Sequence, residues 1–358
     1  MSFVLSIKDT YRQAVEAATG GKNTVLYDSA GNPSIMVVIP QFNISDVIPG
    51  GPTTVHPAFI VDGVVKSEIF ISKFQNIVYN NMACSIPSQD PATYVDFDQA
   101  RTYAANKGAG WHLMTNAEWA AVALWARTNG FLPRGNNNYG SDITAPYEHG
   151  VQTYLDPSTS KTGRVATGSG PKSWAHDDSN EGIFDLNGNV FEWVGGMRLN
   201  NGEIQVMQDN NAADNTVDQS ASSTAWQAIN LTNSGYTAGT LVPPGTTGSA
   251  KYDDVSGAAQ LTDTIVTTTT GGGTYNTFES TTAKSGITVP TIFQELGLYP
   301  VDPTSEGGAG LWMVNSGEML PLRGGSWSNG SGAGVFALDL YNPRSGSSDY
   351  LGFRAAFC

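Results

Sequence analysis

The sequence is poor in cysteine, in charge and in basic residues. Its 358 residues include two cysteines, and Asp, Glu, Lys and Arg together make up 14% of the chain, against about a quarter in an average globular protein. The 18 basic residues face 32 acidic ones, which gives a formal net charge of −14. This negative charge argues against binding to the phosphate backbone of nucleic acids and against adhesion to anionic lipid.

Long hydrophobic runs are also absent. No stretch approaches the roughly 20 apolar residues of a membrane span, so we expect no membrane insertion. The apolar run at the N-terminus is short and is interrupted by Lys8 and Asp9, which is unlike a signal peptide. We therefore expect synthesis in the cytoplasm without a signal peptide. In that setting Cys84 and Cys358 are expected to be unpaired thiols.

Glycine is abundant, with 41 residues, and Thr, Ser and Asn are frequent, which is typical of a chain of strands and loops. Residues 1–52 are expected to form a small N-terminal module or a first subdomain. Apolar residues recur every three or four positions over 6–18 and predict a helix. A strand is predicted over 34–40, and a linker over 48–52. Two interpretations stay open: this unit attaches the protein to something larger, or it packs on the rest.

Residues 53–358 are expected to form the main domain. The pair Asp62-Gly63 between two apolar runs predicts a hairpin with a two-residue turn. Asp96 and Thr115 each precede a helical pattern and have Gln or Glu three residues later, which is typical of a capping box. They predict helices that run to about residue 107 and, from Trp119, to about residue 129.

Further strands are predicted along the chain. Two short strands are expected around Asn187-Gly188, with Phe191 and Trp193 on a buried face and Glu192 on the opposite one. Residues from about 200 to 300 are rich in small polar residues, and we interpret them as a long, loop-rich insertion of short strands and loops on or near the binding face. Its aromatic residues indicate that part of it packs; they are Trp226, Tyr236, Tyr275 and Phe278.

The C-terminal stretch alternates between two kinds of residue. The first kind forms blocks typical of strands, at residues 322–325, 335–338 and 351–357. The second consists of Ser, Gly, Asp, Asn and Tyr, which is the composition of antibody binding loops. Because Asp339 and Tyr341 flank Leu340, one face of that strand is expected to point outward. The stretch predicts a rigid scaffold that presents a polar and aromatic surface.

Three separated motifs resemble those of formylglycine-generating-enzyme-type domains. They are Gly110-Trp-His-Leu-Met-Thr-Asn-Ala-Glu-Trp119, Leu186-Asn-Gly-Asn-Val-Phe-Glu-Trp-Val194, and Arg323-Gly-Gly-Ser-Trp327 with Gly352-Phe-Arg354. Their order and rough spacing match the family over about residues 55–358, apart from the insertion. The resemblance implies an α+β fold of the C-type lectin type, with two helices and twisted antiparallel sheets.

Within that superfamily the C-terminal stretch resembles the variable proteins of diversity-generating retroelements. The run Ala-Gly-X-Phe-Ala-Leu-X-Leu between the Arg-Gly-Gly and Gly-Phe-Arg motifs carries this likeness. In these systems adenines of a template repeat are mutated during reverse transcription. Asp, Ser, Gly, Tyr and Asn are all reachable from an AAY codon by changing only adenines.

This second resemblance implies a variable ligand-binding region over about residues 323–354. Its expected ligand-binding residues are Ser326, Ser328, Asn329, Gly332, Asp339, Tyr341, Asn342, Arg344, Ser347, Ser348, Asp349 and Tyr350. Tyr341 and Tyr350 are expected to be the strongest anchors, because aromatic residues dominate binding hot spots.

The remaining residues of the region are expected to build the scaffold. Gly324 and Gly325 would form tight backbone, Arg354 a buried polar contact, and Trp327, Phe336 and Leu338 the core. The implied partner is a protein or carbohydrate receptor, and not a nucleic acid. The implied location is a virion (a phage tail) or another displaying surface. The oligomeric state is left open.

An enzyme of the same superfamily is the first alternative. Formylglycine-generating enzymes use a pair of cysteines near the end of the domain, and related sulfoxide synthases use a histidine-rich iron site. Here the cysteines lie far apart, and the histidines are scattered without ligand spacing; they are His56, His112, His149 and His176. We therefore predict no enzyme, no catalytic residues and no cofactor. His112 is interpreted as a satisfied structural group, and capping is taken to explain Glu118.

A calcium-dependent carbohydrate-binding lectin is the second alternative. Such sites use clustered carboxylates and amides, and the best candidates are residues 177–181 and 136–138. We interpret both as solvated polar loops rather than as a metal site, and a structural calcium ion is left open.

Overall fold

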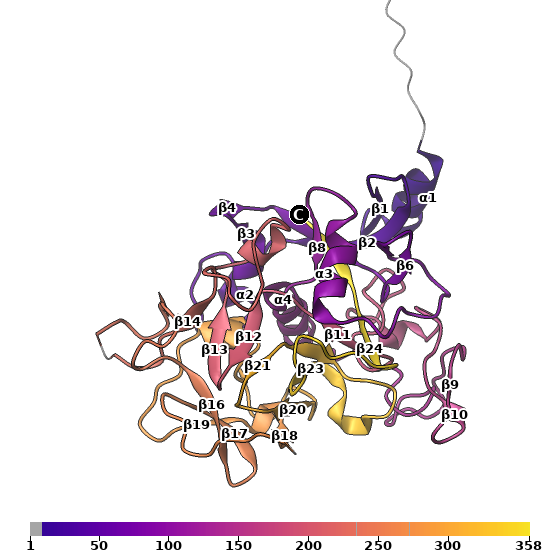
Figure 1. Ribbon diagram of the computed structural model, residues 1–358. Coiled ribbons are helices and arrows are strands. Elements are labelled where there is room, and N and C mark those ends of the chain that lie inside the picture. The colour runs from indigo at the N-terminus through magenta and orange to yellow at the C-terminus, as the bar shows by residue number, and fades with distance from the viewer. Residues whose placement is uncertain (1–8, 234, 272) are drawn as a thin grey trace, which may run out of the picture.

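A five-stranded sheet joins early and late segments of the chain. The computed structural model describes residues 9–233, 235–271 and 273–358. The strand order is β1 (Asn23–Tyr27), β2 (Pro33–Pro40), β5 (Glu68–Ser72), β25 (Ala355–Phe357) and β8 (Trp111–Leu113). The last strand, β25, pairs with β5 on one side and β8 on the other, so the yellow C-terminal strand lies among indigo and purple elements in Figure 1.

The described part of the first 52 residues contributes to this sheet. Helix α1 (Thr10–Thr19) begins after Asp9, whose carboxylate accepts the backbone N–H of Arg12. The start of the predicted helix, residues 6–8, lies outside the described residues. The strand predicted over 34–40 is confirmed as β2, which pairs with both β1 and β5. A short helix, α2 (Ile44–Val47), precedes the segment expected to be a linker.

The two helices predicted from capping boxes are confirmed. They are α3 (Phe97–Ala105) and α4 (Asn116–Thr128), and both capping boxes form as expected. Helix α4 starts before the predicted Trp119 because its N-cap is Thr115. It lies at the centre of the molecule in Figure 1, and its residues from Asn116 to Leu124 are buried. The expected total of two helices is incomplete, since the described ranges hold five α-helices with α1, α2 and α5 (Ile292–Glu295).

A six-stranded sheet carries the C-terminal motifs. Its order is β18 (Thr274–Thr277), β20 (Gly310–Met313), β23 (Gly334–Leu340), β22 (Leu322–Gly324), β11 (Phe191–Trp193) and β24 (Leu351–Phe353). Two of its pairs are parallel, β11 with β24 and β20 with β23, so the expectation of antiparallel sheets is wrong here. Parallel neighbours need long crossover connections, and the chain between these strands supplies them.

The prediction of two strands around Asn187-Gly188 is wrong in part. Only β11 forms, and the residues before it make an isolated bridge between Ala175 and Phe184. β11 lies between β22 and β24, in the interior of the sheet. Glu192 is buried together with its neighbours, with its carboxylate bonded to Arg354 and Gln75, rather than facing solvent as expected.

The segment expected to be a loop-rich insertion supplies most of an eight-stranded sheet. The strands are β12 (Met197–Asn200), β13 (Glu203–Val206), β14 (Gln227–Ile229), β15 (Leu241–Val242), β16 (Lys251–Val255), β17 (Ala258–Thr262), β19 (Thr282–Ala283) and β21 (Glu318–Met319). Trp226 and Phe278 are buried, as predicted, whereas Tyr236 and Tyr275 are exposed. Phe278 belongs to the same hydrophobic cluster as Trp119 of α4 and Leu338 of β23.

Three hairpins and five short 3₁₀ turns complete the described structure. The hairpin predicted at Asp62-Gly63 is confirmed, and both residues have the positive φ that its turn requires, 49° and 73°. The hairpin strands are β3 (Ile60–Val61), β4 (Val64–Val65), β6 (Ile77–Tyr79), β7 (Met82–Cys84), β9 (Leu155–Asp156) and β10 (Lys161–Thr162). The turns are η1 (Pro57–Phe59), η2 (Lys172–Trp174), η3 (Asn211–Ala213), η4 (Phe278–Ser280) and η5 (Gly330–Gly332). Within the described ranges, no helix has the length and apolar character needed to cross a membrane.

Candidate ligand-binding surface

A buried ion pair ties the second sequence motif to the last one. Arg354 approaches Glu192 with two nitrogens, Nε at 2.5 Å from Oε2 and Nη2 at 2.6 Å from Oε1. Its remaining donors reach the backbone carbonyl oxygens of Ser72 and Phe184 at 3.0 Å each. Both charged side chains are buried, and the fork geometry satisfies them. The expected buried polar contact of Arg354 is confirmed.

The first motif is tied to the C-terminal strands by a tryptophan. The indole Nε1–H of Trp119 donates to the carbonyl oxygen of Val335 at 2.7 Å. Gly324 has a φ of 88°, and a Cβ there would lie 3.3 Å from the Trp119 ring, so the predicted tight backbone is confirmed. Arg323 donates to Asn116 Oδ1 at 2.6 Å, which holds β22 against the start of α4.

His112 has a structural role, as predicted. Its Nδ1 lies 3.0 Å from the carbonyl oxygen of Gly110, and its Nε2 lies 2.8 Å from Oε1 of Glu118. Burial opposes a charge on the ring, but the Glu118 carboxylate outweighs it and raises the pKa of His112. Capping alone does not account for Glu118, because the same carboxylate accepts from His112, from Asn210 and from the N–H of Thr115.

Residues 326–350, called here the contact segment, leave this framework between β22 and β24. The loop after β23 is held through its backbone. The carbonyl oxygens of Asn342, Arg344, Ser348, Asp349 and Tyr350 accept hydrogen bonds from the N–H groups of Leu320, Phe97 and Tyr94, from Nη1 of Arg164, and from the N–H of Phe191. These bonds use no side chain of the contact segment. The course of the loop is therefore set by the framework.

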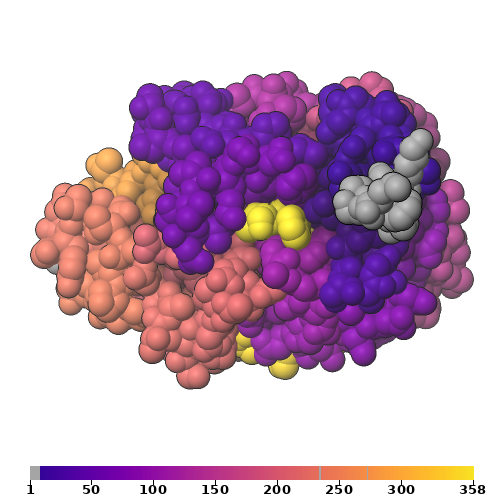
Figure 2. Space-filling view, turned by 90° about the horizontal axis from the view of Figure 1, so that it is seen from above, coloured from indigo at the N-terminus to yellow at the C-terminus, as the bar shows by residue number. Residues whose placement is uncertain are grey.

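The predicted ligand-binding residues fall into three groups by exposure. Exposed side chains are those of Ser328, Tyr341, Ser347 and Tyr350. Partly buried side chains are those of Asn329, Asn342, Arg344, Ser348 and Asp349. Ser326, Gly332 and Asp339 are buried. Tyr341 and Tyr350, the expected anchors, have exposed fractions of 44% and 39%. On the face seen in Figure 2, the yellow C-terminal residues appear as a small central area and at the lower edge.

Asp339 contradicts the expectation of an outward-facing residue. β23 lies between β20 and β22, and its residues from Val335 to Leu340 are buried, so both of its faces are covered by other parts of the chain. The Asp339 carboxylate accepts the backbone N–H of Tyr341 at 2.7 Å and the Asn342 side-chain amide at 3.3 Å. Burial raises the pKa of Asp339 to about 6. In the structure, the Asp339 carboxylate caps the turn that leads into the loop.

Arg344 is also engaged inside the molecule. Its Nε and Nη2 lie 3.0 and 2.9 Å from the two carboxylate oxygens of Glu318, and its Nη1 lies 2.9 Å from Asp98 Oδ1. Nη2 also donates to the carbonyl oxygen of Gln219. The guanidinium thus fastens the loop to α3 and to β21.

Aromatic residues outside the contact segment border it, and the sequence did not identify them as part of the surface. Tyr275 of β18, with an exposed fraction of 51%, lies 5.2 Å from Trp312 of β20 between ring centroids. A Cβ on Gly273, next to that strand, would lie 2.9 Å from the Tyr341 ring. The insertion therefore reaches the contact segment, in agreement with the prediction that it lies near the binding face.

A second aromatic border comes from the loop before β9. The hydroxyl of Tyr154 donates to Asp349 Oδ2 at 2.9 Å, and its ring centroid lies 5.9 Å from that of Trp327. Trp327 in turn meets Tyr350 edge-to-face at 6.3 Å. The sequence offered only one sign that Tyr154 belongs to this surface, namely an aromatic residue in a loop-like stretch. Its partner Asp349 lies 195 positions away.

The two thiols are placed in different environments. Cys84 is buried in β7, and Cys358 is partly buried beside the carbonyl oxygen of Gly110. Burial raises the pKa of both thiols, that of Cys358 to about 12. A thiol is a good nucleophile or metal ligand only as the thiolate. Neither cysteine has the activating surroundings that this chemistry requires.

The two polar clusters considered for calcium are engaged internally. Asn136 is buried and donates to Gly163 and Asn189. The Asp177 carboxylate accepts from the Ser179 backbone and hydroxyl. Over the part of the chain that the structure describes, no three His, Cys, Asp or Glu side chains gather as a metal site would require. The interpretation of residues 136–138 as a solvated loop is wrong, because Asn136 and Asn137 are buried.

These features define a class of domain: an α+β framework that holds an exposed polar and aromatic loop by its backbone. The profile of the family described as "Sulfatase-modifying factor enzyme 1-like domain" matches residues 19–234. The chain belongs to this family, which confirms the resemblance to formylglycine-generating-enzyme-type domains. The matched segment begins before residue 52 and continues through α3, α4 and β11.

Several solved structures are similar at low identity. PvdO from Pseudomonas aeruginosa is 15% identical, with 93% of this chain and 97% of that chain covered and a TM-score of 0.36. Treponema denticola variable protein 1 is 12% identical, with 94% and 98% covered and a TM-score of 0.34. A Major Tropism Determinant variant is 13% identical, with 90% and 63% covered and a TM-score of 0.31. No curated protein matches the chain.

Proposed function

We propose that this protein binds a receptor through the contact segment, whose exposed side chains vary while the framework stays constant. The observation that carries this proposal is the backbone anchoring of the loop by Leu320, Tyr94, Phe97, Arg164 and Phe191. Because those bonds use carbonyl oxygens of the loop, its exposed side chains can be exchanged without loss of these backbone anchors. A surface of this kind suits recognition of changing partners.

The composition of the exposed positions supports the same proposal. Tyr341 and Tyr350 offer large amphipathic contact area at low entropic cost, and Ser328 and Ser347 offer adaptable hydrogen bonding. Tyr275 and Tyr154 lie outside the contact segment and would add constant aromatic contacts at its border. The partner would be a protein or a carbohydrate displayed on a cell surface. Several copies on a phage tail or another carrier would raise a modest single-site affinity.

The neighbouring DNA tests how the surface arises. We expect a near-repeat of the codons for about residues 323–354, differing mainly at adenines, beside a reverse-transcriptase gene. The adenine differences should fall on the codons of exposed residues such as Tyr341 and Tyr350, and not on those of Arg323 or Arg354. A locus without such a repeat would contradict diversification by a retroelement.

Binding itself is tested separately. The purified protein would be applied to a glycan array and to immobilised surface proteins of candidate host cells. We expect a saturable partner whose binding is lost when Tyr341 and Tyr350 are both replaced by Ala. Binding that survives this double replacement would contradict the contact segment as the site. The oxidase alternative predicts copper-dependent turnover of a cysteine-containing peptide, which the buried thiols argue against.

A further inference from the structure

A pocket of about 470 Å³ lies between β2 and α4. No residue of the contact segment lines it. Its walls come from the turn after α1, from β2, from α4 and from the loop at residues 176–181. We call it the His176 pocket. Its volume is in the range of small-molecule sites, and nothing in the proposed receptor binding uses it.

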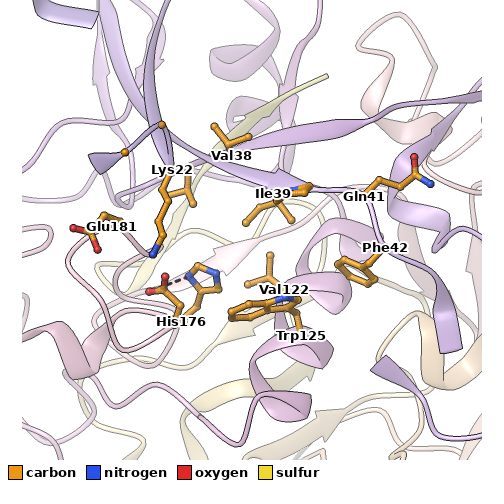
Figure 3. A pocket seen from close by; sticks show the side chains of 14 residues that line it. Lys22, Val38, Ile39, Gln41, Phe42, Val122, Trp125, His176 and Glu181 are labelled. Carbon is orange, nitrogen blue, oxygen red and sulfur yellow. Dashed lines mark ion pairs between the residues drawn. The ribbon is translucent and has the colours of Figure 1, made fainter. Parts of the chain in front are cut away.

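The body of the His176 pocket is apolar. Figure 3 shows Ile39 of β2 on one side, facing Val122 and Trp125 of α4, with Phe42 at the far end. Val122 and Ile39 are buried, whereas Phe42 and Trp125 are only partly buried. Two aromatic side chains therefore border an open apolar space. Such walls favour a flat or bulky hydrocarbon group.

One end of the pocket is polar and presents the imidazole of His176 to the open space. His176 is 5% exposed, and its Nδ1 accepts the backbone N–H of Ile183 at 2.9 Å. Burial lowers the pKa of His176 to about 4, so the ring is neutral near pH 7, and its single proton is on Nε2. Among the described residues, no group accepts a hydrogen bond from that Nε2–H. Nε2 is not one of the fully buried polar atoms that lack a partner, and His176 lines the pocket, so this N–H is available to a ligand acceptor.

Acceptor groups lie beside the same imidazole. Asp177 Oδ1 is 4.0 Å from His176 Nδ1, and Glu181 lines the same pocket. Figure 3 shows both His176 and Glu181 near Lys22 at this end of the pocket. The two carboxylates disfavour a ligand carboxylate. A neutral hydroxyl is the smallest group that accepts from Nε2–H and also donates to a carboxylate.

We infer that the His176 pocket binds a small neutral ligand that joins an aromatic or alicyclic body to a hydroxyl group. The body packs between Ile39, Val122 and Trp125. The hydroxyl oxygen accepts from His176 Nε2–H, and the hydroxyl proton is donated to Asp177 or Glu181. This inference is independent of receptor binding by the contact segment.

Calorimetry and ligand-observed NMR with para-propylphenol test the inference, with propylbenzene as the counterpart without a hydroxyl. We expect saturable binding of the phenol at about 1 mM or below and weaker binding of propylbenzene. His176→Asn keeps an acceptor for the Ile183 N–H but removes the Nε2–H donor. This variant should weaken binding of the phenol about three- to tenfold and leave binding of propylbenzene unchanged.

Val122→Phe fills the apolar space and should abolish binding of both compounds, with circular dichroism to verify folding. If that variant does not fold, ¹⁵N-histidine labelling of the unmodified protein provides the second measurement. The phenol should shift the His176 Nε2 resonance, and propylbenzene should not. Absence of saturable phenol binding, equal loss of both ligands in His176→Asn, or an unshifted His176 resonance would each overturn the inference.

Discussion

At the residue scale, burial decides which polar side chains serve the scaffold and which are left for contact. Asp339 and Tyr341 are two positions apart, yet one caps a turn inside the sheet and the other is exposed. Sequence alternation correctly placed Leu340 inside and Tyr341 outside, but it also placed Asp339 outside, and Asp339 is buried. It could not show that both faces of β23 would be buried, because the elements that pack on a sheet come from distant parts of the sequence.

Replacement of Asp339 by Asn should make stability less dependent on pH. Burial raises the pKa of Asp339 to about 6, above its unfolded value, so ionisation in the folded state costs stability. That cost is absent below the unfolded pKa and grows as pH rises through about 6. The free energy of unfolding of Asp339→Asn relative to wild type should therefore rise by about 1–3 kcal/mol between about pH 4 and about pH 8.

Urea denaturation at several pH values measures this difference. Glu68→Gln, which changes an exposed carboxylate in β5, is the matched control and should show little pH-dependent difference. A difference for Asp339→Asn that does not vary with pH would mean that this carboxylate is not held in an unfavourable charged state.

Tyr341→Ala and Tyr350→Ala should each weaken receptor binding by about 1–3 kcal/mol with little change in melting temperature. Both rings are exposed, so they contribute contact area rather than core packing. Tyr11→Ala is the control, because Tyr11 has the same exposed fraction as Tyr341 but lies on α1. A sharp fall in melting temperature would instead make these tyrosines part of the core.

At the element scale, local sequence signals predicted helices and turns better than sheets. The capping boxes at Asp96 and Thr115 and the Asp62-Gly63 turn depend on residues within four positions, and all three are confirmed. The position of β11 depends on β22 and β24, which follow it by more than a hundred residues. Its burial on both faces, and hence the role of Glu192, could not be predicted from alternation.

Breaking the Arg354–Glu192 pair should destabilise the six-stranded and five-stranded sheets together. Arg354→Met leaves Glu192 as an unpaired buried charge and should lower the free energy of unfolding by about 3–5 kcal/mol. The double variant Arg354→Met with Glu192→Met removes both charges and should recover part of that loss. Urea denaturation measures both. A single variant as stable as wild type would show that the pair does not hold the motifs together.

At the scale of the whole molecule, the insertion and the framework share one core. The sequence predicted short strands and loops that pack in part, and Phe278, Tyr252 and Leu261 of the insertion lie in the same hydrophobic cluster as Trp119 and Leu338. The family motifs predicted the framework because they contain its buried contacts. They could not predict how the short strands of the insertion pair into one sheet, because these strands lie outside the motifs.

Phe278→Ala should destabilise the entire chain by about 3–5 kcal/mol, because a fully buried ring in the shared core is lost. Tyr236→Ala, at an exposed residue of the same insertion, should have little effect. Unfolding followed by tryptophan fluorescence and by circular dichroism should coincide for both variants. Separate transitions would show that the insertion folds as an independent unit.

The central claim is that the contact segment can be rewritten without altering the molecule that carries it. The direct test is the melting temperature of one variant with Ser328→Asn, Tyr341→Asp, Ser347→Asn and Tyr350→Ser combined. All four side chains are exposed, so we predict a melting temperature within about 5 °C of wild type. A fall of about 15 °C or more would contradict the claim, because the exposed residues would then be part of what holds the fold together.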